Sequence, residues 1–486
     1  MGTVLGKLKP ALVWKYFEEI SQHPRPSKHE EKVAEYIFSV GKKLNLETVK
    51  DAFGNIIIRK PATPGKEKLK TVVLQGHIDM VCEKNRGVKH DFDNDPIQVY
   101  IDGDFVKAKG TTLGADNGIG VAAALAVLED KTIKHGPIEC LFTLDEETGL
   151  TGAASLDPKI LKADILLNLD SEELGTFFIG CSGGKNTAAE FTFKPQALPK
   201  NMATFEVKVD GLKGGHSGLE INAGLGNAVK ILTRLLWNAQ TNFKLKVSKI
   251  EGGNKHNAIP REAFAIVSIP TASVNGFKKY VSNYNKTVNE ELATNEPGLQ
   301  VSLGKAKGSF KVIDSATQTT VLNALYAVPH GVITMSPDIP GLVETSTNLA
   351  VITTEKNTIS IVTSQRSSIA SENQDIVDMV TSVFLLAGAK VTHGDGYPGW
   401  KPNVNSEILK VFKAVYKKMN GKEPEVAAIH AGLECGIISE KYPKMDMISF
   451  GPTMFGVHSP DERLNIPSVQ PFYDLLATVL SNIPNK

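Results

Sequence analysis

The stretch TVVLQGHID, residues 71–79, decides the expected fold. It begins as a short, mostly apolar strand and ends with His77 and Asp79, which lie on one face if the chain stays extended. Similar strand patterns occupy residues 55–58, 139–144 and 164–169, and residues 118–129 between them have a helical pattern. Short apolar strands separated by helices indicate an α/β layer with a buried sheet.

Carboxylates and imidazoles follow the ends of these strands. ECLFTLDEETG (139–149) ends with Asp145, Glu146 and Glu147, ADILLNLD (163–170) ends with Asp170, GADNGIG (114–120) sets Asp116 before a helix, and ISFGPTMFGVHSP (448–460) carries His458 in the loop after a strand. In open α/β sheets, ligands gather at the carboxyl ends of the strands. We therefore expect these side chains to lie near one another.

Each of these residues also has an ordinary structural interpretation. Asp116 and Asp170 are residue types that cap helices. The three consecutive acidic residues after Leu144 could form a solvated turn, and His77 or His458 alone could be a partly buried structural histidine. Together, however, these interpretations require five coincidences at the same kind of position.

The combined set fits a hydrolase with two metal ions. Three carboxylates and two neutral histidines supply a charge of about −3 against +4 for two divalent cations, and such a site can hold a hydroxide and polarise a carbonyl. A general base that is not itself a ligand completes the chemistry. Glu146 and Glu147 would point apart at a strand end, so one can ligate a metal and the other can act on water.

The N-terminal region predicts two helices. The first covers residues 10–22, and the HPRP segment (23–26) interrupts the chain. The second is expected to begin at Ser27, because Glu30 follows three residues later in the pattern of a capping box.

The pattern changes after Gly184. AEFTF and ATFEVKVDG alternate with period two, and helices are expected over residues 224–240, 275–294, 315–327 and 373–387. The earlier character then returns, with helices over 403–419 and 467–481 and strands over 426–429 and 446–450. We predict a first domain split into residues 1–187 and 398–486, with an α+β domain of residues 188–397 inserted between them.

Composition excludes several classes of function. Lys and Arg number 54 and Asp and Glu 53, so the net charge of +1 gives no general electrostatic basis for binding nucleic acid or an anionic membrane. The longest apolar run, residues 118–128, is far shorter than the ~20 residues that span a bilayer. The four cysteines form no CxxC pair and no disulfide framework, which fits a cytoplasmic protein.

The motifs QGHIDMV, GADNGIG, DEETGLTGA, NLDSEE and GVHSPDE resemble the five metal-site motifs of the M20 metallopeptidases. HPRPSKHE (23–30) and AIHAGLECG (428–436) more narrowly resemble the bacterial aminoacyl-histidine dipeptidases. The resemblance implies an α/β catalytic domain, with a mostly parallel mixed sheet flanked by helices, interrupted by an α+β lid. It implies that His77, Asp116 and Asp170 hold one metal and that Asp116, Glu147 and His458 hold the other. It makes Glu146 the general base beside a metal-bridging hydroxide, and Asp79 the carboxylate that orients His77. It further implies a cis peptide between Asp116 and Asn117.

The inserted domain resembles the family's lid, which also carries dimer contacts, so the resemblance implies a homodimer. His216 in GLKGGHSG would donate a hydrogen bond to the oxyanion from the partner subunit, although a histidine in an exposed loop is the alternative. Asn257 and Arg366 correspond to positions that bind the substrate backbone and terminal carboxylate, and Glu434 is a candidate for the free amine. His430 and His256 are weaker candidates with expected structural roles.

Two other motifs lack the context that their functions need. Gly118-x-Gly120-x-x-Ala123 matches a dinucleotide fingerprint, but no strand runs directly into it and Asp116 would repel a pyrophosphate, so we interpret it as close helix packing. Gly180-x-Ser182-x-Gly184 matches a nucleophile elbow, but the next residues have a strand pattern rather than a helical one.

Three functions remain to be compared. The first is a dipeptidase for short peptides, in particular aminoacyl-histidine dipeptides such as β-alanyl-histidine. The second is another M20-type amidohydrolase, such as an N-acyl amino acid deacylase or a tripeptidase, because the motifs do not define the pocket. The third, an inactive binding protein, would be expected to lose a ligand or the base, and none is lost. The expected cofactor is two zinc ions per subunit, with cobalt or manganese as alternatives.

Overall fold

The computed structural model describes residues 4–306, 308 and 310–486 and divides into two compact units. Unit 1 runs to Cys181 and adds Trp400–Ala428 and Leu433–Lys486, and unit 2 comprises Ser182–Gly399 and Ile429–Gly432. Unit 2 begins earlier than residue 188 because strand β9 (Gly183–Thr192) pairs with β20 (Thr358–Ser367) inside it. The short segment Ile429–Gly432, which sequence reasoning assigned to the first domain, also belongs to unit 2.

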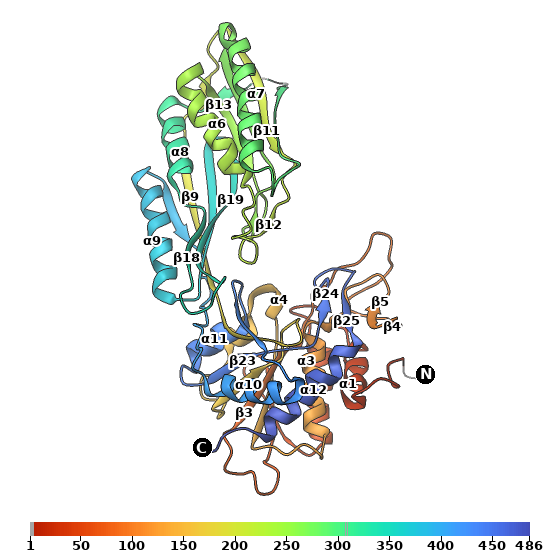
Figure 1. Ribbon diagram of the computed structural model, residues 1–486. Helices are drawn as coiled ribbons and strands as arrows, with labels where there is room; N and C mark the ends of the chain where they lie inside the picture. Colours follow the sequence, from red (N-terminus) through yellow and green to blue (C-terminus); the bar gives the residue numbers. More distant parts are fainter. Residues whose placement is uncertain (1–3, 307, 309) are drawn as a thin grey trace. The chain divides into compact units, whose positions relative to one another are not determined.

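Unit 1 is built on a mixed sheet of eight strands flanked by helices, which confirms the expected α/β class (Figure 1). In sheet order the strands are β1 (Glu47–Lys50), β2 (Ile56–Lys60), β6 (Ile138–Thr143), β3 (Val72–His77), β7 (Ile165–Asn168), β23 (Asp446–Ser449), β8 (Thr176–Cys181) and β22 (Glu425–Ile429). The four strands from β6 to β23 are parallel, whereas the pairs β1–β2, β2–β6 and β23–β8 are antiparallel.

The middle of this sheet is fully buried. Every residue of β3, β6 and β7 is buried, which explains why their sequences are mostly apolar rather than strictly alternating. The helices of unit 1 are α1 (Ala11–Ser21), α2 (Glu31–Lys43), α3 (Ala115–Glu129), α4 (Glu146–Gly149), α5 (Thr151–Ser155), α10 (Glu407–Asn420), α11 (Glu434–Lys441) and α12 (Ile466–Ser481). The longest apolar run of the sequence forms most of α3, which packs against β3 and β6. Among the described residues, none of the helices has the length and apolar character needed to span a membrane.

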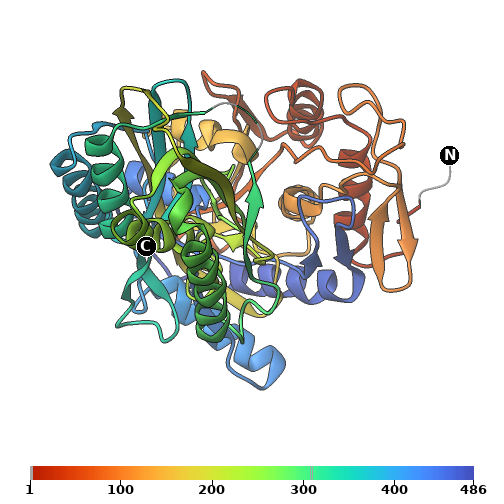
Figure 2. The same cartoon turned by 90° about the horizontal axis from the view of Figure 1, so that it is seen from above.

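A second, four-stranded sheet lies at the rim of unit 1. Its order is β24 (Met454–Phe455), β25 (Arg463–Asn465), β5 (Phe105–Ala108) and β4 (Val99–Asp102). The blue β24–β25 hairpin and the orange β4–β5 hairpin lie side by side in both views (Figures 1 and 2). This sheet joins the loop after β24 to the segment that leads from β5 into α3.

Unit 2 is an α+β domain with an antiparallel sheet. The sheet order is β16 (Gln300–Lys305), β11 (Met202–Asp210), β15 (Ala263–Pro270), β13 (Lys246–Gly252), β19 (Val343–Thr354), β20, β9 and β21 (Lys390–His393), with β18 (Gly331–Met335) paired to β19. The helices α6 (Ala228–Phe243), α7 (Val274–Glu291), α8 (Ser315–Ala327) and α9 (Ala370–Leu386) share one hydrophobic core with this sheet (Figure 1). Two short ladders, β12 (Gly215–His216) with β14 (Ala258–Ile259) and β10 (Gln196–Ala197) with β17 (Lys311–Val312), complete the unit.

The expected start of the second helix is wrong. Helix α2 begins at Glu31, and its N-cap residue Glu30 makes no capping hydrogen bond with its side chain. The Ser27 hydroxyl instead donates to Asp79 at 2.7 Å, and the Glu30 carboxylate accepts the N–H groups of Lys28 and Asp145 at 2.8 and 3.0 Å. The two residues thus have the sequence pattern of a capping box, but their side chains bond to residues outside the helix.

The two glycine motifs have the structural contexts that sequence reasoning gave them. A Cβ at Gly120 would lie 2.5 Å from the carbonyl oxygen of Leu169, so this glycine permits close packing of α3 on the strand end. Ser182 lies between strands β8 and β9, without the helix that a nucleophile elbow requires.

Candidate metal centre

Three parallel strands bring candidate side chains to one edge of the main sheet of unit 1. His77 is the last residue of β3, Glu146 follows β6 by three residues, and Asp170 follows β7 by two. Because β6, β3 and β7 are adjacent and parallel, their carboxyl ends meet at this edge.

Two clusters of potential ligands share one carboxylate. In the first, His77 Nε2 lies 3.1 Å from Asp116 Oδ1 and 3.4 Å from Asp170 Oδ1. In the second, His458 Nε2 lies 3.2 Å from Asp116 Oδ2 and 3.0 Å from Glu147 Oε2. Each set of three offers ligand atoms within 4.8 Å of one another. The two oxygens of Asp116 therefore face two separate clusters, which is the geometry of a bridging ligand.

Asp116 occupies an irregular start of helix α3. Its backbone and that of Asn117 depart from helical dihedral angles, and the peptide between them is cis, as the resemblance implied. The Asn117 side chain donates to the carbonyl oxygen of Leu169 at 2.7 Å, so this turn is attached to the segment that carries Asp170.

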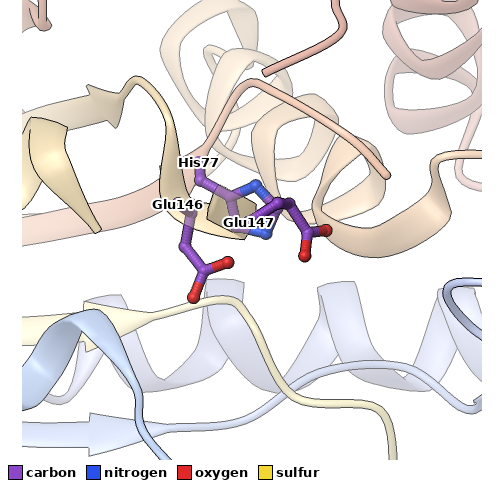
Figure 3. Close-up of side chains that lie close together, drawn as sticks. All are labelled: His77, Glu146 and Glu147. Atoms are coloured by element: carbon purple, nitrogen blue, oxygen red, sulfur yellow. The ribbon is translucent and has the colours of Figure 1, made fainter. Parts of the chain in front are cut away.

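Glu146 and Glu147 begin the short helix α4 rather than ending a strand. Figure 3 shows their carboxylates pointing in different directions near the His77 ring. Glu147 reaches His458, whereas Glu146 forms a further group with His77 and Glu147. Burial raises the pKa of Glu146 well above its ordinary value, and the carboxylates of Asp170 and Glu147 add to this effect, although His77 opposes it. A raised pKa is suited to a carboxylate that accepts and returns a proton.

Asp79 is the most extensively bonded side chain of the centre. Its Oδ1 lies 3.1 Å from His77 Nδ1 and accepts the N–H of Glu146 at 3.0 Å. Its Oδ2 accepts the Ser27 hydroxyl at 2.7 Å and the N–H of Glu147 at 3.1 Å. Asp79 thus orients the His77 ring and also fixes the start of the helix that carries both glutamates.

The residues present fit a pair of divalent cations. Imidazole nitrogen and carboxylate oxygen are the donor types that zinc and related metals take. Hydrogen bonds to Asp116 and Glu147 raise the pKa of His458 to about 11, so the cluster strongly favours positive charge. Buried Glu147 Oε1 has no hydrogen-bond partner within the described part of the chain. A cation would replace the proton on His458 and give that oxygen a partner.

Glu434 lies fully buried at the start of helix α11. Its Oε2 accepts Gln75 Nε2 at 2.5 Å and the Thr143 hydroxyl at 2.8 Å, while Oε1 has no partner among the described residues. Burial raises its pKa to about 7. Gln75 and Thr143 belong to β3 and β6, so Glu434 is attached to the strands that carry the centre.

Three further candidates belong to unit 2. His216 on β12 pairs with Ala258, and the N–H of Ser217 donates to the carbonyl oxygen of Asn257 at 2.9 Å. His216 and Asn257 therefore line one pocket of about 740 Å³, whose other walls include the cationic Lys213, Lys255 and Arg261.

The His216 ring has a defined donor. Its Nδ1 accepts the N–H groups of Gly218 and Leu219 at 3.2 and 3.0 Å, so the proton of the neutral ring is assigned to Nε2. Burial and the charge of Arg366 lower the His216 pKa to about 4. The ring is therefore neutral at pH 7 and offers an Nε2–H donor.

Arg366 is a buried cation on strand β20. Its Nη1 donates to the Tyr397 hydroxyl at 2.8 Å, and its Nε has no hydrogen-bond partner among the described residues. The two weaker candidates differ from it. His430 lies 2.7 Å from the Ser346 hydroxyl through Nε2, and burial lowers its pKa to about 3, while burial also lowers the pKa of His256.

Sequence reasoning missed two charged residues that support the centre. Glu462 accepts four backbone N–H groups from residues 113–116, and Arg25 donates to carbonyl oxygens of residues 78, 79 and 114. Glu462 lies in GVHSPDE and Arg25 in HPRPSKHE. Their partners are backbone groups, which any residue type supplies, so no sequence pattern could have revealed these bonds.

Comparisons with known proteins place the chain in a family. Residues 73–482 match the model of Peptidase family M20/M25/M40. The chain is 45% identical over 482 residues to the cytosol non-specific dipeptidase of Escherichia coli (strain K12), covering 99% of each protein. The crystal structure of aminoacylhistidine dipeptidase from Vibrio alginolyticus has a TM-score of 0.93 at 46% identity, covering 99% of this chain and 98% of that one. Aminopeptidase PepT from Bacillus cereus, with a TM-score of 0.57 at 16% identity over 98% of this chain and all of the other, shares the fold. This chain is a member of peptidase family M20/M25/M40.

Proposed function

We propose that this protein is a dipeptidase with two divalent metal ions per chain, acting on aminoacyl-histidine dipeptides such as β-alanyl-histidine. The observation that carries the proposal is the pair of ligand clusters joined by Asp116. A dipeptide substrate is supported by the names of the two relatives that are 45% and 46% identical over almost the whole chain. The aminoacyl-histidine class is supported by the name of the second of them alone.

The proposed roles follow the geometry of unit 1. His77, Asp116 and Asp170 hold one cation, and Asp116, Glu147 and His458 hold the other. The bound pair supplies an activated water and polarises the scissile carbonyl. Glu146 takes the proton of the attacking water through its carboxylate and returns it to the leaving amine, while Asp79 keeps the His77 ring in place. We propose zinc as the native metal, with cobalt or manganese as alternatives that the same donor atoms accept.

Four residues are proposed to recognise the substrate. The unpartnered oxygen of Glu434 suits a free ammonium group, and the unpartnered Nε of Arg366 suits a terminal carboxylate. The Nε2–H of His216 suits the oxyanion, and Asn257, which lines the same pocket as His216, suits the substrate backbone. We further propose that unit 2 acts as a lid and forms a homodimer in which His216 serves the partner subunit, and that the protein is cytoplasmic.

The test is a substrate panel on metal-reconstituted protein, with metal content measured alongside. A dipeptide should be hydrolysed far better than its N-acetylated form, because the proposed amine site requires a free ammonium group. It should also be hydrolysed far better than a tripeptide, because the proposed amine and carboxylate sites together bind both ends of a small substrate. Preference for N-acetylated amino acids would instead favour a deacylase, and preference for tripeptides a tripeptidase; either is the alternative within the same family.

A further inference from the structure

Glu462, the last residue of GVHSPDE, has no part in the proposed chemistry, although the residue is only 3% exposed. Its Oε2 accepts the N–H groups of Leu113 and Gly114 at 2.7 and 2.9 Å. Its Oε1 accepts those of Ala115 and Asp116 at 2.7 and 3.3 Å. One buried carboxylate therefore binds four consecutive N–H groups of the turn that ends at the bridging Asp116.

Arg25 binds the same turn through its carbonyl side. Its guanidinium donates to the carbonyl oxygens of Gly114, Ile78 and Asp79, the last at 2.7 Å. Gly114 has a φ of +68°, and a Cβ there would lie 2.4 Å from Arg25 Nη2. The turn is thus held between a buried anion and a buried cation.

Glu462 also belongs to the loop that carries His458. Both residues lie between β24 and β25, and β25 pairs with β5, the strand that leads toward Asp116. His458 itself has a 52% exposed side chain and a φ of +61°, so little packing holds it. The carboxylate of Glu462 is therefore a direct link between the segments that supply His458 and Asp116.

We propose that Glu462 is a positioning residue that preassembles the cation site formed by Asp116, Glu147 and His458. The proposal rests on the dinuclear centre proposed above. A glutamine at position 462 keeps one acceptor oxygen and turns an NH₂ group toward N–H donors, so buried N–H groups of the turn lose their partner and the turn relaxes. Residues that orient metal ligands commonly change metal affinity by ~10–100-fold.

The experiment is a titration of metal-free protein with Co²⁺, followed through the visible absorption bands of the ion and checked by metal analysis. The variants are Glu462→Gln and a matched control, Glu296→Gln. Glu296 is likewise buried and accepts backbone N–H groups, from Lys213 at 2.8 Å and Gly226 at 2.9 Å, but it belongs to unit 2, which carries none of the proposed metal ligands.

We expect wild type and Glu296→Gln to bind two Co²⁺ ions with equal dissociation constants. Glu462→Gln should bind one of the two at least ~10-fold more weakly and show altered absorption bands for that ion. Equal binding of both ions by Glu462→Gln would overturn the positioning role while leaving the dinuclear centre intact. A wild-type protein that binds fewer than two ions would overturn the proposed centre itself.

Glu462→Asp decides the question if the glutamine variant does not fold. It keeps the charge but is one methylene shorter, so it cannot reach all four N–H groups. We expect intermediate weakening of the same ion, with a metal-free unfolding temperature close to that of Glu296→Gln. Undiminished Co²⁺ binding by Glu462→Asp, in a variant whose unfolding temperature has fallen, would show a purely structural role.

Discussion

The two units of the molecule differ in which buried polar atoms lack a partner. In unit 1 the supporting carboxylates of Asp79 and Glu462 each accept four donors, and the unpartnered atoms include carboxylate oxygens of Glu147 and Glu434. In unit 2 the unpartnered buried atoms include the Nε of Arg366. These bonds and unpartnered atoms are those of the residues that the structure describes.

The difference has a physical meaning. A buried polar atom without a partner costs about 1–3 kcal/mol, so it is retained where a ligand supplies the missing bond. Unpartnered carboxylate oxygens favour a cation or an ammonium group, and an unpartnered guanidinium N–H favours a carboxylate. Unit 1 therefore has carboxylate oxygens that suit a cation or an ammonium group, and unit 2 has a guanidinium N–H that suits a carboxylate.

The largest expected effect tests whether Glu146 is the general base and Glu147 a metal ligand. Glu146→Gln should keep both metals and lose ~10²-fold or more in kcat, because it removes the proposed base without removing a ligand. Glu147→Gln should instead weaken one metal site, because it replaces a proposed ligand carboxylate with a neutral amide. Metal analysis and turnover of both variants check this. Loss of metal from Glu146→Gln alone would exchange the two roles.

The second test concerns the donor in unit 2. His216→Ala should lower kcat by ~10²-fold with unchanged metal content, because one oxyanion donor is worth ~3 kcal/mol. If His216 serves the partner subunit, mixing His216→Ala with Glu146→Gln after subunit exchange should restore about a quarter of wild-type activity. Half of randomly paired dimers are mixed, and each has one intact site. Proven exchange without recovery would mean that His216 acts within its own chain or not at all.

The third test compares the two ends of the substrate. Arg366→Ala should raise KM by ~30-fold for a dipeptide with a free carboxylate, because a charge-assisted hydrogen bond is worth about 2 kcal/mol. The same variant should change KM little for the corresponding dipeptide amide. Arg234→Ala is the matched control, since Arg234 lies in the same unit but pairs with Glu291 at an exposed position. An equal rise in KM for both substrates would remove the carboxylate assignment.

The fourth test uses the pKa of Glu434. Burial raises this pKa to about 7, so the carboxyl gains a proton below pH 7 and loses the negative charge that would hold an ammonium group. For a dipeptide without a titrating side chain, such as alanyl-leucine, kcat/KM should fall ~10-fold per pH unit below this value. Glu434→Gln should have a lower kcat/KM and lack this acidic limb. An unchanged acidic limb in Glu434→Gln would assign the titration to another group.

The sequence predicted the proposed metal ligands better than the residues that hold those ligands in position. His77 and Asp170 lie at the ends of apolar strands, and such strands are visible because every residue of β3 and β7 is buried. Glu462 was not visible, because its four partners are backbone N–H groups some 346–349 residues earlier in the chain. A carboxylate that binds backbone leaves no partner residue type to recognise.

Fold prediction failed in a similar way at the N-terminus. Helix α8 has the predicted bounds, because local propensity and capping by Asp314 determine where it begins. Helix α2 begins four residues later than predicted, because Ser27 and Glu30 bond to residues of other segments instead of capping it. Tertiary contacts determine whether a serine and a glutamate at this spacing cap a helix or bond to another segment. The local sequence does not show these contacts.

The smallest expected effect tests whether the Ser27 hydroxyl supports Asp79 rather than capping helix α2. Its hydroxyl is one of four donors to Asp79, so Ser27→Ala should leave the other three in place and weaken Co²⁺ binding by only ~5-fold, about 1 kcal/mol. If Ser27 capped α2 instead, the variant would lower the unfolding temperature of the metal-free protein and leave Co²⁺ affinity unchanged. Ser406→Ala is the control for a cap, since its hydroxyl accepts the N–H of Leu409 at the start of α10 and, like that of Ser27, donates to a carboxylate, that of Asp446 at 2.7 Å. A Ser27→Ala variant that behaves like Ser406→Ala would return Ser27 to the capping role, and Asp79 would then depend on the backbone and His77 alone.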